Sequence, residues 1–369
     1  MEFTFEDAIT ALGGAAGIFH YANQVPPMQE YMFATLLPER NDPEYTIRTG
    51  TMTIRATMAG LAATDSPYAP GGVTEVSTFV KDVAKITNQV SITEAALRRI
   101  QSILARMTLE GQNTLEFLQT EVLNFMDHAI MQAHYDRMEW LRGKALITGA
   151  INWTYNGVPL VVDYGIPAEN FLPNRTGTAA WDSTASGFWT DIRSLASTLR
   201  YNVAAYITHI DTLLAIVNND VNKAELVRQE GNLYTLRRLV GDNDRPSSDM
   251  LDTVTIATYQ REGEILDPSN PGKTTIIKFF PTGKILAVGR NTASGYRVGM
   301  GAQPDPEDEF ALGYTHLAPT VEGGGRPGRW AQVYMPENLP MQLHGRAVTN
   351  GLPVIEAPKK IAVASSDLS

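Results

Sequence analysis

The residues best suited to chemistry stand at a predicted strand end in the second half of the chain. His209 directly follows a predicted strand over 203–208, and Asp211 comes two residues later. Ligands and catalytic groups of α/β proteins gather at such strand ends, so an α/β enzyme that uses His209 and Asp211 is one hypothesis. Asp211 is explained equally well as the N-cap of a short helix that ends near Val217. No serine stands in a G-x-S-x-G motif.

Two glycine-containing segments imitate phosphate-binding motifs but lack their context. Residues 323–328 spell G-x-G-x-x-G. A phosphate-binding version follows a strand and opens a helix, whereas this one contains Pro327 and precedes a predicted strand. Residues 272–274 resemble the end of a P-loop, but Asp267 stands where its first glycine belongs. We therefore predict loops here and no nucleotide site.

Composition argues against several further classes of function. The 369 residues include no cysteine, which excludes disulfides, thiol nucleophiles and Cys-ligated zinc, and the six histidines form no H-E-x-x-H. With 30 Lys+Arg against 40 Asp+Glu, the net charge is −10, and no basic block marks a dedicated nucleic-acid binder. No apolar run approaches the roughly 20 residues of a membrane span, and the N-terminus lacks the basic start of a secretion signal. We expect no catalytic, cofactor or metal site and no membrane contact.

The elements that position these residues begin with an arm and a long hairpin. Residues 1–44 are apolar in places but interrupted by glycine and proline, and they are too few to fold alone. We predict that they pack on a long helix of the chain or on a neighbouring subunit. Residues 45–92 are Thr-rich and alternate, which predicts an extended β-hairpin with its turn at 65–72. The parity of the apolar positions changes at Gly50, which suggests a β-bulge there.

Helical periodicity follows the hairpin. Ser91 and Glu94 form a capping box before a predicted short helix that ends near Met107. Asn113 caps a much longer helix over 114–147, about 50 Å long at about 1.5 Å per residue. Its predicted buried stripe is Leu115, Leu118, Val122, Phe125, Ala129, Met138, Leu141 and Ala145. A helix of this length needs a sheet or neighbouring subunits beside it.

The remaining pattern is mixed α/β. A hairpin is predicted with Asn156-Gly157 at its turn. Helices are predicted at 188–199, 211–217 and 223–239, and strands at 203–208, 253–258, 274–280, 284–288, 330–334, 341–344 and 361–364.

The end of the long helix and the hairpin after it carry a family motif. The helix ends in an E-x-L-R-x-x-A-L-x-x-G stretch, and V-D-[FY]-G follows the hairpin. The matching residues are Glu139, Leu141, Arg142, Ala145, Leu146, Gly149, Val162, Asp163, Tyr164 and Gly165. In these positions the chain resembles the major capsid proteins of tailed bacteriophages, of the lambda capsid protein E type. The resemblance is specific over about 45–167 and architectural beyond that.

The resemblance implies an α+β chain with the Hong Kong 97-like capsid fold. Its implied parts are an N-terminal arm (1–44), an extended two-stranded loop (45–92), a peripheral domain with a long spine helix (93–180), an α/β axial domain (181–325) and a return to the peripheral domain (326–369).

The implied function is structural. Members of the family are major capsid proteins, not enzymes, and self-assemble into the hexamers and pentamers of an icosahedral shell around double-stranded phage DNA. The implied location is the virion capsid, assembled in the cytoplasm of a bacterial host. Expected partners are further copies of the chain, a portal, an optional decoration protein, and packaged DNA contacted non-specifically at the inner face. Because residues 1–44 are too short to act as a scaffold, a separate scaffolding protein is also expected.

Two alternatives remain open from the sequence. An encapsulin-type nanocompartment has the same fold but encloses enzyme cargo in place of a genome. The α/β enzyme with His209 and Asp211 belongs to a different class. Some family members cross-link a loop lysine to a neighbouring asparagine; Lys81 and Lys85 lie in the returning limb of the hairpin, but no motif identifies a partner, so no cross-link is predicted.

Overall fold

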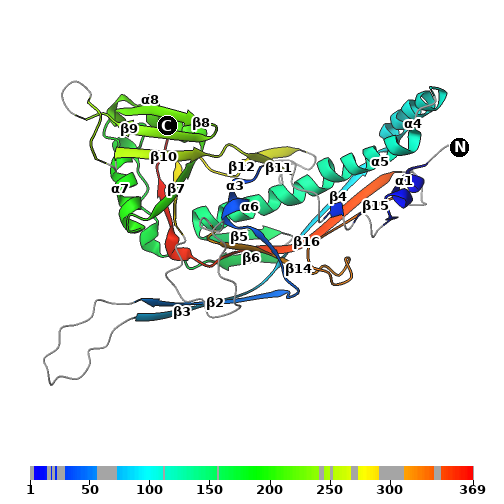
Figure 1. The fold of residues 1–369 in the computed structure, drawn as a ribbon, viewed down its shortest axis with the longest axis horizontal. Helices are drawn as coiled ribbons and strands as arrows, with labels where there is room; N and C mark the ends of the chain where they lie inside the picture. The colour runs from blue at the N-terminus through cyan, green and yellow to red at the C-terminus, as the bar shows by residue number, and fades with distance from the viewer. Residues whose placement is uncertain are drawn as a thin grey trace, which may run out of the picture.

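The structure is a computed structural model, and its described residues fall in several ranges. These are 4–14, 18, 21–22, 30–55, 73–110, 113–155, 158–240, 245–249, 252–266, 273–290, 311–335 and 342–368, with the backbone alone described at 48–55, 73–80, 153–155 and 158–160. The molecule is elongated. The N-terminus lies at one end, the C-terminus lies in a sheet at the other, and a long helix runs between them (Figure 1).

The long helix, residues 114–148, is called the spine helix below. It consists of α5 (Thr114–Phe125), a π-helical segment (Met126–Met131) and α6 (Gln132–Thr148). As predicted, Asn113 caps it, accepting a hydrogen bond from the backbone N–H of Glu116. It ends at Gly149, whose φ of 69° is a left-handed conformation that favours glycine.

The buried face of the spine helix differs from the prediction around the π-helical segment. A π turn contains more residues than an α turn, which changes the local spacing of the buried positions. The predicted stripe placed Phe125 and Ala129 in the core, but the structure buries Met126 and Ile130 and leaves the two predicted residues half-buried. The side-chain amide of Asn88 donates to the carbonyl of Ala129 at 3.2 Å, which satisfies an acceptor in this irregular turn.

A five-stranded sheet lies along the spine helix. Its order is β1 (Glu39–Asn41), β14 (Gly313–Ala318), β16 (Leu343–Ile355) and β15 (Arg329–Tyr334), with β4 (Ala84–Ile92) also paired to β16. The long strand β16 has β4 along one edge, while β15 and β14 follow one another along its other edge. Apolar residues of this sheet share one hydrophobic cluster with the spine helix.

A six-stranded sheet forms the other end of the molecule. Its order is β17 (Ile361–Ser365), β13 (Lys284–Gly289), β7 (Val203–Thr208), β10 (Thr253–Thr258), β9 (Leu233–Arg238) and β8 (Ala224–Glu230). Two helices pack on it, α7 (Phe188–Thr198) and α8 (Ile210–Asn218). Their apolar faces and the sheet make a second hydrophobic cluster around Trp181 and Phe188.

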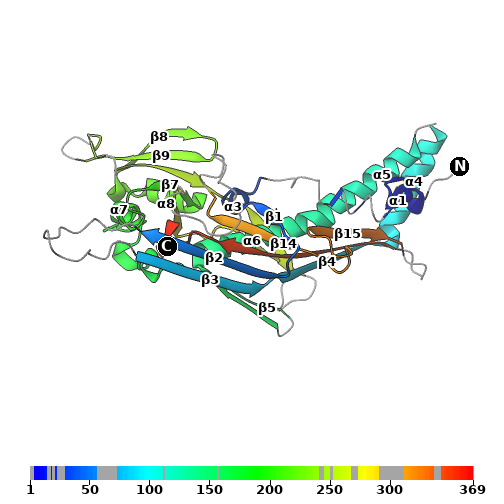
Figure 2. The ribbon, with the colours of Figure 1, turned by 60° about the horizontal axis from the view of Figure 1, so that its bottom comes forward.

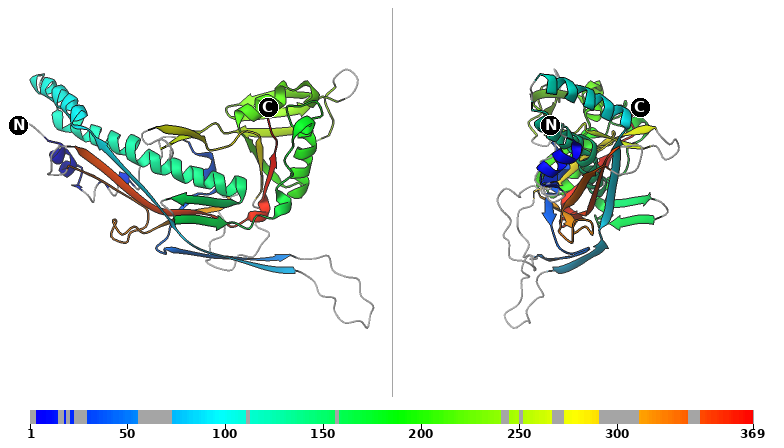
Figure 3. Two further views of the ribbon diagram at one scale, coloured as in Figure 1. Left: turned by 180° about the vertical axis from the view of Figure 1, so that it is seen from behind. Right: turned by 90° about the vertical axis from the view of Figure 1, so that its right-hand side faces the viewer.

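Three two-stranded hairpins extend from these sheets. They are β2 (Thr46–Arg55) with β3 (Val73–Asp82), β5 (Ala150–Tyr155) with β6 (Val158–Asp163), and β11 (Glu262–Leu266) with β12 (Thr274–Lys278). Figure 2 shows β2 and β3 running along one side of the molecule, and Figure 3 shows them standing off from both sheets. In the described structure, β2 and β3 pair only with each other.

The N-terminal residues pack on the chain's own spine helix. They include α1 (Phe5–Ala11) and α3 (Met32–Leu36). Phe5 and Phe33 are buried in the same hydrophobic cluster as the spine helix, and α1 lies against α5. For its described residues, this confirms one of the two predicted locations of the arm.

The remaining elements are the helix α4 (Glu94–Leu109) and 3-10 turns at Ala168–Asn170, Gly177–Ala179, Asp220–Asn222 and Pro358–Lys360.

Several predicted elements are wrong. The Leu-rich stretch 223–239 is the hairpin of β8 and β9, because Gly231, at φ 57°, turns the chain between two limbs whose leucines imitate a helical stripe. Ser91 lies inside β4, and α4 is capped at Thr93 without a side-chain hydrogen bond. The pairing of β2 with β3 is regular through Gly50, so there is no bulge. The strand predicted at 341–344 runs on to Ile355, and β14 was missed.

Sheet membership crosses the predicted domain boundaries in four places. β1 of the predicted arm and β4 of the predicted hairpin segment 45–92 both pair in the five-stranded sheet, so the hairpin itself ends at Asp82. β14 lies within the proposed axial segment 181–325 but pairs in the five-stranded sheet, and β17 lies within the proposed return segment 326–369 but pairs in the six-stranded sheet. Asn156-Gly157 and the hairpin turn at 65–72 lie outside the described residues. The domain division itself therefore stays a proposal.

Candidate functional site

The two residues of the enzyme hypothesis do lie together, at the start of α8. His209, and not Asp211, is the N-cap: its Nδ1 accepts a hydrogen bond from the backbone N–H of Asp211 at 3.2 Å. The Asp211 carboxylate instead forms an ion pair with Lys278 at 2.8 Å. Burial, and then the Lys278 charge, lower the pKa of His209, which favours a neutral ring that can accept this bond. His209 thus caps the start of α8, while Asp211 connects this helix to Lys278 of β12.

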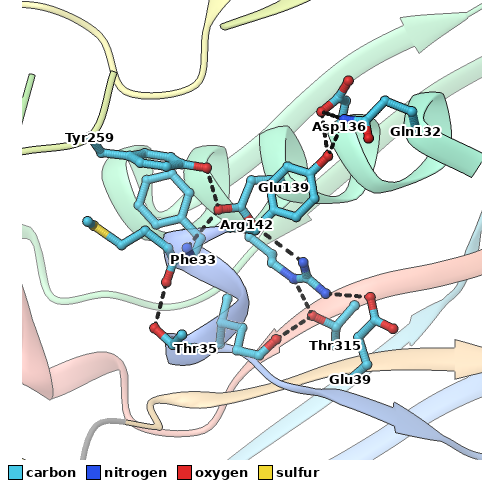
Figure 4. A network of polar contacts seen from close by, with 12 residues as sticks. Phe33, Thr35, Glu39, Gln132, Asp136, Glu139, Arg142, Tyr259 and Thr315 are labelled. Carbon is cyan, nitrogen blue, oxygen red and sulfur yellow. Dashed lines mark hydrogen bonds and ion pairs between the residues drawn. The ribbon is translucent and has the colours of Figure 1, made fainter. Parts of the chain in front are cut away.

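A buried carboxylate on the spine helix is the centre of the most extensive polar network (Figure 4). Glu139 is completely buried. One of its carboxylate oxygens accepts hydrogen bonds from the backbone N–H of Phe33 at 2.7 Å and from the hydroxyl of Tyr259 at 2.8 Å. Because Phe33 belongs to α3 and Tyr259 follows β10, one side chain connects the arm, the spine helix and the chain leaving the six-stranded sheet.

Arg142, one turn further along the spine helix, extends this network to the five-stranded sheet. Its guanidinium forms ion pairs with Glu139 at 3.3 Å and with Glu39 of β1 at 2.9 Å. Its Nε donates to the hydroxyl of Thr315 in β14 at 2.8 Å, and that hydroxyl donates to the carbonyl of Leu37 at 2.8 Å. A planar guanidinium can satisfy such differently placed acceptors at once.

Glu39 balances two buried arginines. It forms ion pairs with Arg142 of the spine helix and with Arg329 of β15. The Arg329 guanidinium also lies over the ring of Tyr135, 4.2 Å from its centroid. Burial alone would raise the pKa of Glu39, but the charges of Arg329 and Arg142 hold that pKa below its usual value. β1 is thereby fixed to the spine helix by charge, while its backbone pairs with β14.

In the same network the pKa of Glu139 is raised, whereas that of Glu39 is lowered. Burial raises the pKa of Glu139, and the Arg142 charge together with the donors from Phe33 and Tyr259 oppose the shift only partly. Nearby on α6, burial lowers the pKa of His134 to about 3, so this ring stays neutral while its Nδ1 contacts the Thr349 hydroxyl at 2.9 Å.

Tyrosines of the arm add further polar contacts along the spine helix. Tyr31 donates its hydroxyl hydrogen to Asp136 at 2.6 Å, and the amide of Gln132 donates to both of them (Figure 4). Tyr21 makes the equivalent contact with Asp127 at 2.6 Å. The arm is therefore held by a series of polar anchors and not by apolar burial alone.

Two glycines allow close packing around the spine helix. A Cβ added at Gly143 would lie 2.8 Å from the Phe33 ring, so glycine is what lets α3 approach α6. On the other side, a Cβ at Gly345 of β16 would overlap Ile130 and lie 2.7 Å from Phe125. β16 thus packs directly on the π-helical segment.

Several strand edges have no partner within the described chain. β8 ends the six-stranded sheet, and its residues Leu226 and Val227 are exposed. β4 is an edge of the five-stranded sheet with alternate polar side chains outward. An open strand edge offers unpaired N–H and C=O groups to another chain. Together with the hairpin of β2 and β3, these edges are candidate surfaces for assembly.

The remaining motifs have no ligand-binding geometry. Residues 323–328 form a loop between β14 and β15 and open no helix, as predicted. In the ranges that the structure describes, no cluster of three or more His, Asp or Glu side chains is arranged to hold a metal ion. None of the described helices combines the length and the apolar character needed to span a bilayer.

Sequence reasoning found only part of this network. Glu139 and Arg142 were singled out as motif positions, and their spacing of three on a mostly apolar helix face was the signal for a buried pair. Glu39, Tyr259, Thr315 and their contacts were missed, because they come from distant segments that only the tertiary fold brings together.

Comparison with known proteins identifies the fold. No family model matches the chain, and no curated protein matches its sequence. Among solved structures, a protein described as a capsid protein of a prophage from E. coli CFT073 superposes with a TM-score of 0.56 at 12% identity, covering 96% of this chain and 99% of that one. The mature capsid of bacteriophage PhiM1 (TM-score 0.45, 10% identity, 94% and 90% covered) and the SrpI encapsulin of Synechococcus elongatus PCC 7942 (0.42, 11%, 93% and 90%) are more distant.

The first of these likenesses extends over nearly the full length of both chains. At 12% identity it shows a shared fold and nothing more. The predicted fold class is confirmed: the chain is α+β and has the Hong Kong 97-like capsid fold, as the resemblance around Glu139 and Arg142 implied.

Proposed function

We propose that this chain is the major capsid protein of a tailed bacteriophage, the subunit that self-assembles into a closed icosahedral shell. The observation that carries the proposal is the fold shared with a prophage capsid protein over 96% of the chain. An elongated subunit with a projecting hairpin and open strand edges suits this function, because such elements bury little surface until another copy covers them.

The proposed mechanism is geometric, without a chemical step. One chain forms hexamers and pentamers through heterologous contacts, which close into a shell when the rotation between subunits permits. Many modest contacts made together give a stable whole. The shell encloses double-stranded DNA in the virion, after assembly in the host cytoplasm with a separate scaffolding protein, a portal and, where present, a decoration protein. The net charge of −10 suits a wall that does not hold packaged DNA tightly.

Purification of the protein, followed by sedimentation and negative-stain microscopy, tests the proposal. We expect rings, tubes or shells at high protein concentration, with correctly sized shells only when a scaffolding protein is present. A protein that stays monomeric under all conditions would refute the proposal. Particles filled with one enzyme and no DNA would favour the encapsulin alternative.

A further inference from the structure

One exposed corner of the six-stranded sheet combines backbone strain with positive charge. It consists of Arg200, Tyr201, Arg290, Lys359 and Lys360, and we call it the basic corner. It lies where α7 ends, β13 ends and β17 begins, next to the link between the two sheets (Figure 1).

The backbone contacts bring these residues together. The backbone N–H of Arg290 donates to the carbonyl of Asn202 at 3.0 Å. A Cβ added at the neighbouring Gly289 would lie 3.2 Å from the side chain of Lys360 and 3.4 Å from the Asn202 carbonyl. The start of β7, the end of β13 and the residues just before β17 are therefore adjacent. The cationic residues of the basic corner lie on these neighbouring segments.

Two consecutive residues of the corner adopt a conformation that favours glycine. Arg200 has a φ of 54° and Tyr201 a φ of 58°. Among the described residues, ten glycines have positive φ, and the only other non-glycine example is Lys223. A side chain in the left-handed region is strained. Glycine would fit the backbone of this turn better, so the chain retains Arg and Tyr here at the expense of local stability.

The side chains at this turn gain little from their own subunit. Tyr201 is 67% exposed, and Arg200 is exposed and forms no ion pair with any described residue. The turn itself is secured by the backbone, since the N–H of Tyr201 donates to the Ala196 carbonyl at 2.6 Å. The strained backbone thus presents a tyrosine and an arginine to the outside in fixed positions.

We propose that the basic corner binds a carboxylate-bearing surface of a second copy of this chain, with Arg200 and Tyr201 as the central contact residues. Tyr and Arg are enriched among residues that dominate protein interfaces. A second copy carries an excess of ten negative charges, which attracts a local cluster of cations. A phosphate backbone needs no such rigid aromatic residue, so the geometry favours a protein surface over DNA. The inference rests on the proposed shell function and names one contact within it.

The test compares the wild-type protein with R200G, Y201G and the control K223G. Lys223 is also exposed and positively charged, with a φ of 45°, but lies outside the basic corner. R200G and K223G therefore remove the same charge and relieve the same kind of strain. Assembly is followed by light scattering against protein concentration, thermal unfolding is measured on the dissociated subunit, and binding to a short DNA duplex is measured by fluorescence anisotropy.

We expect R200G and Y201G to unfold at or above the wild-type temperature but to need about tenfold more protein for half-maximal assembly. K223G should assemble like the wild type, and added salt should weaken wild-type assembly more than that of R200G. Normal assembly of R200G and Y201G would overturn the inference, as would equal impairment of K223G. Normal assembly with lost DNA binding would overturn it in favour of phosphate contact. If the wild-type protein itself never assembled, the shell function and the inference would both fall.

Discussion

Replacing Arg142 by methionine isolates the charge at the centre of the buried network. Arg142 is 1% exposed and forms ion pairs with Glu139 and Glu39. Methionine fills a similar volume but leaves the Glu139 carboxylate buried without a cation. Removing one partner of a buried ion pair costs about 3–5 kcal/mol. We expect R142M to lose that much free energy of unfolding at pH 7, while Glu39 keeps its contact with Arg329.

The loss should depend on pH in a definite direction. Burial already raises the pKa of Glu139 with Arg142 present, and removing the guanidinium raises it further. Between the unfolded and the folded pKa, the folded state then binds more protons than the unfolded state, so stability falls as pH rises through that window. Protonation removes the buried charge, and R142M should therefore be closer to wild type at pH 5 than at pH 8.

Urea unfolding of the dissociated subunit, followed by circular dichroism at several pH values, measures both effects. The double variant E139Q/R142M should recover about 2 kcal/mol of the loss, because a glutamine oxygen still accepts from Phe33 and Tyr259 but carries no charge. R346M is the control: Arg346 is exposed and lies over the ring of Trp330, so its loss should stay within about 1 kcal/mol. A loss for R142M below about 1 kcal/mol, or one that does not change with pH, would refute the reasoning.

Three further changes test the packing and the projections. Gly345→Val places side-chain atoms where Ile130 and Phe125 lie, so the free energy of unfolding should fall by about 1–3 kcal/mol in thermal unfolding. An unchanged unfolding midpoint would mean that β16 does not pack tightly on the π-helical segment. Deleting 1–27 removes buried apolar residues, so the unfolding temperature of the subunit should fall measurably. An unaltered unfolding temperature would contradict the packing of the arm on its own spine helix. Deleting 62–73 should leave the unfolding temperature nearly unchanged and abolish normal particles in negative stain, whereas loss of folding would place this loop in the subunit's own core.

The sequence predicted the elements whose burial follows a simple period. The strands at 203–208 and 253–258 were located to the residue, since β-branched and apolar residues there stand between clear breaks. The spine helix was predicted over 114–147 and spans 114–148, because a one-sided apolar stripe can persist for many turns only in a helix. Beyond the π-helical segment the predicted Met138, Leu141 and Ala145 are buried, whereas Met126 and Ile130 take the buried positions predicted for Phe125 and Ala129.

The failures have physical causes of two kinds. In 223–239, leucines in two adjacent strands stand at helical spacings by coincidence, and Gly231 could have suggested the turn. At α8, His209 takes the cap that Asp211 was expected to provide, because the helix begins at Ile210, and the Asp211 carboxylate contacts Lys278 of a distant strand. The first is a local ambiguity, but the second depends on tertiary contacts that the local sequence does not contain.

The buried charges also limit how the arm can take part in assembly. The arm was expected to lie on the spine helix or on a neighbour, and Glu39 shows why the first holds for its final part: it balances both Arg142 and Arg329. If the segment around Glu39 left the subunit, two buried guanidinium groups would lose a carboxylate, and the cost of an uncompensated buried charge would oppose its release. Tyr31 and Phe33 add hydrogen bonds to the spine helix just before it. Any exchange of arms between subunits must therefore be confined to residues before Tyr31, where the anchors are apolar contacts and the single hydrogen bond from Tyr21 to Asp127 within the described residues.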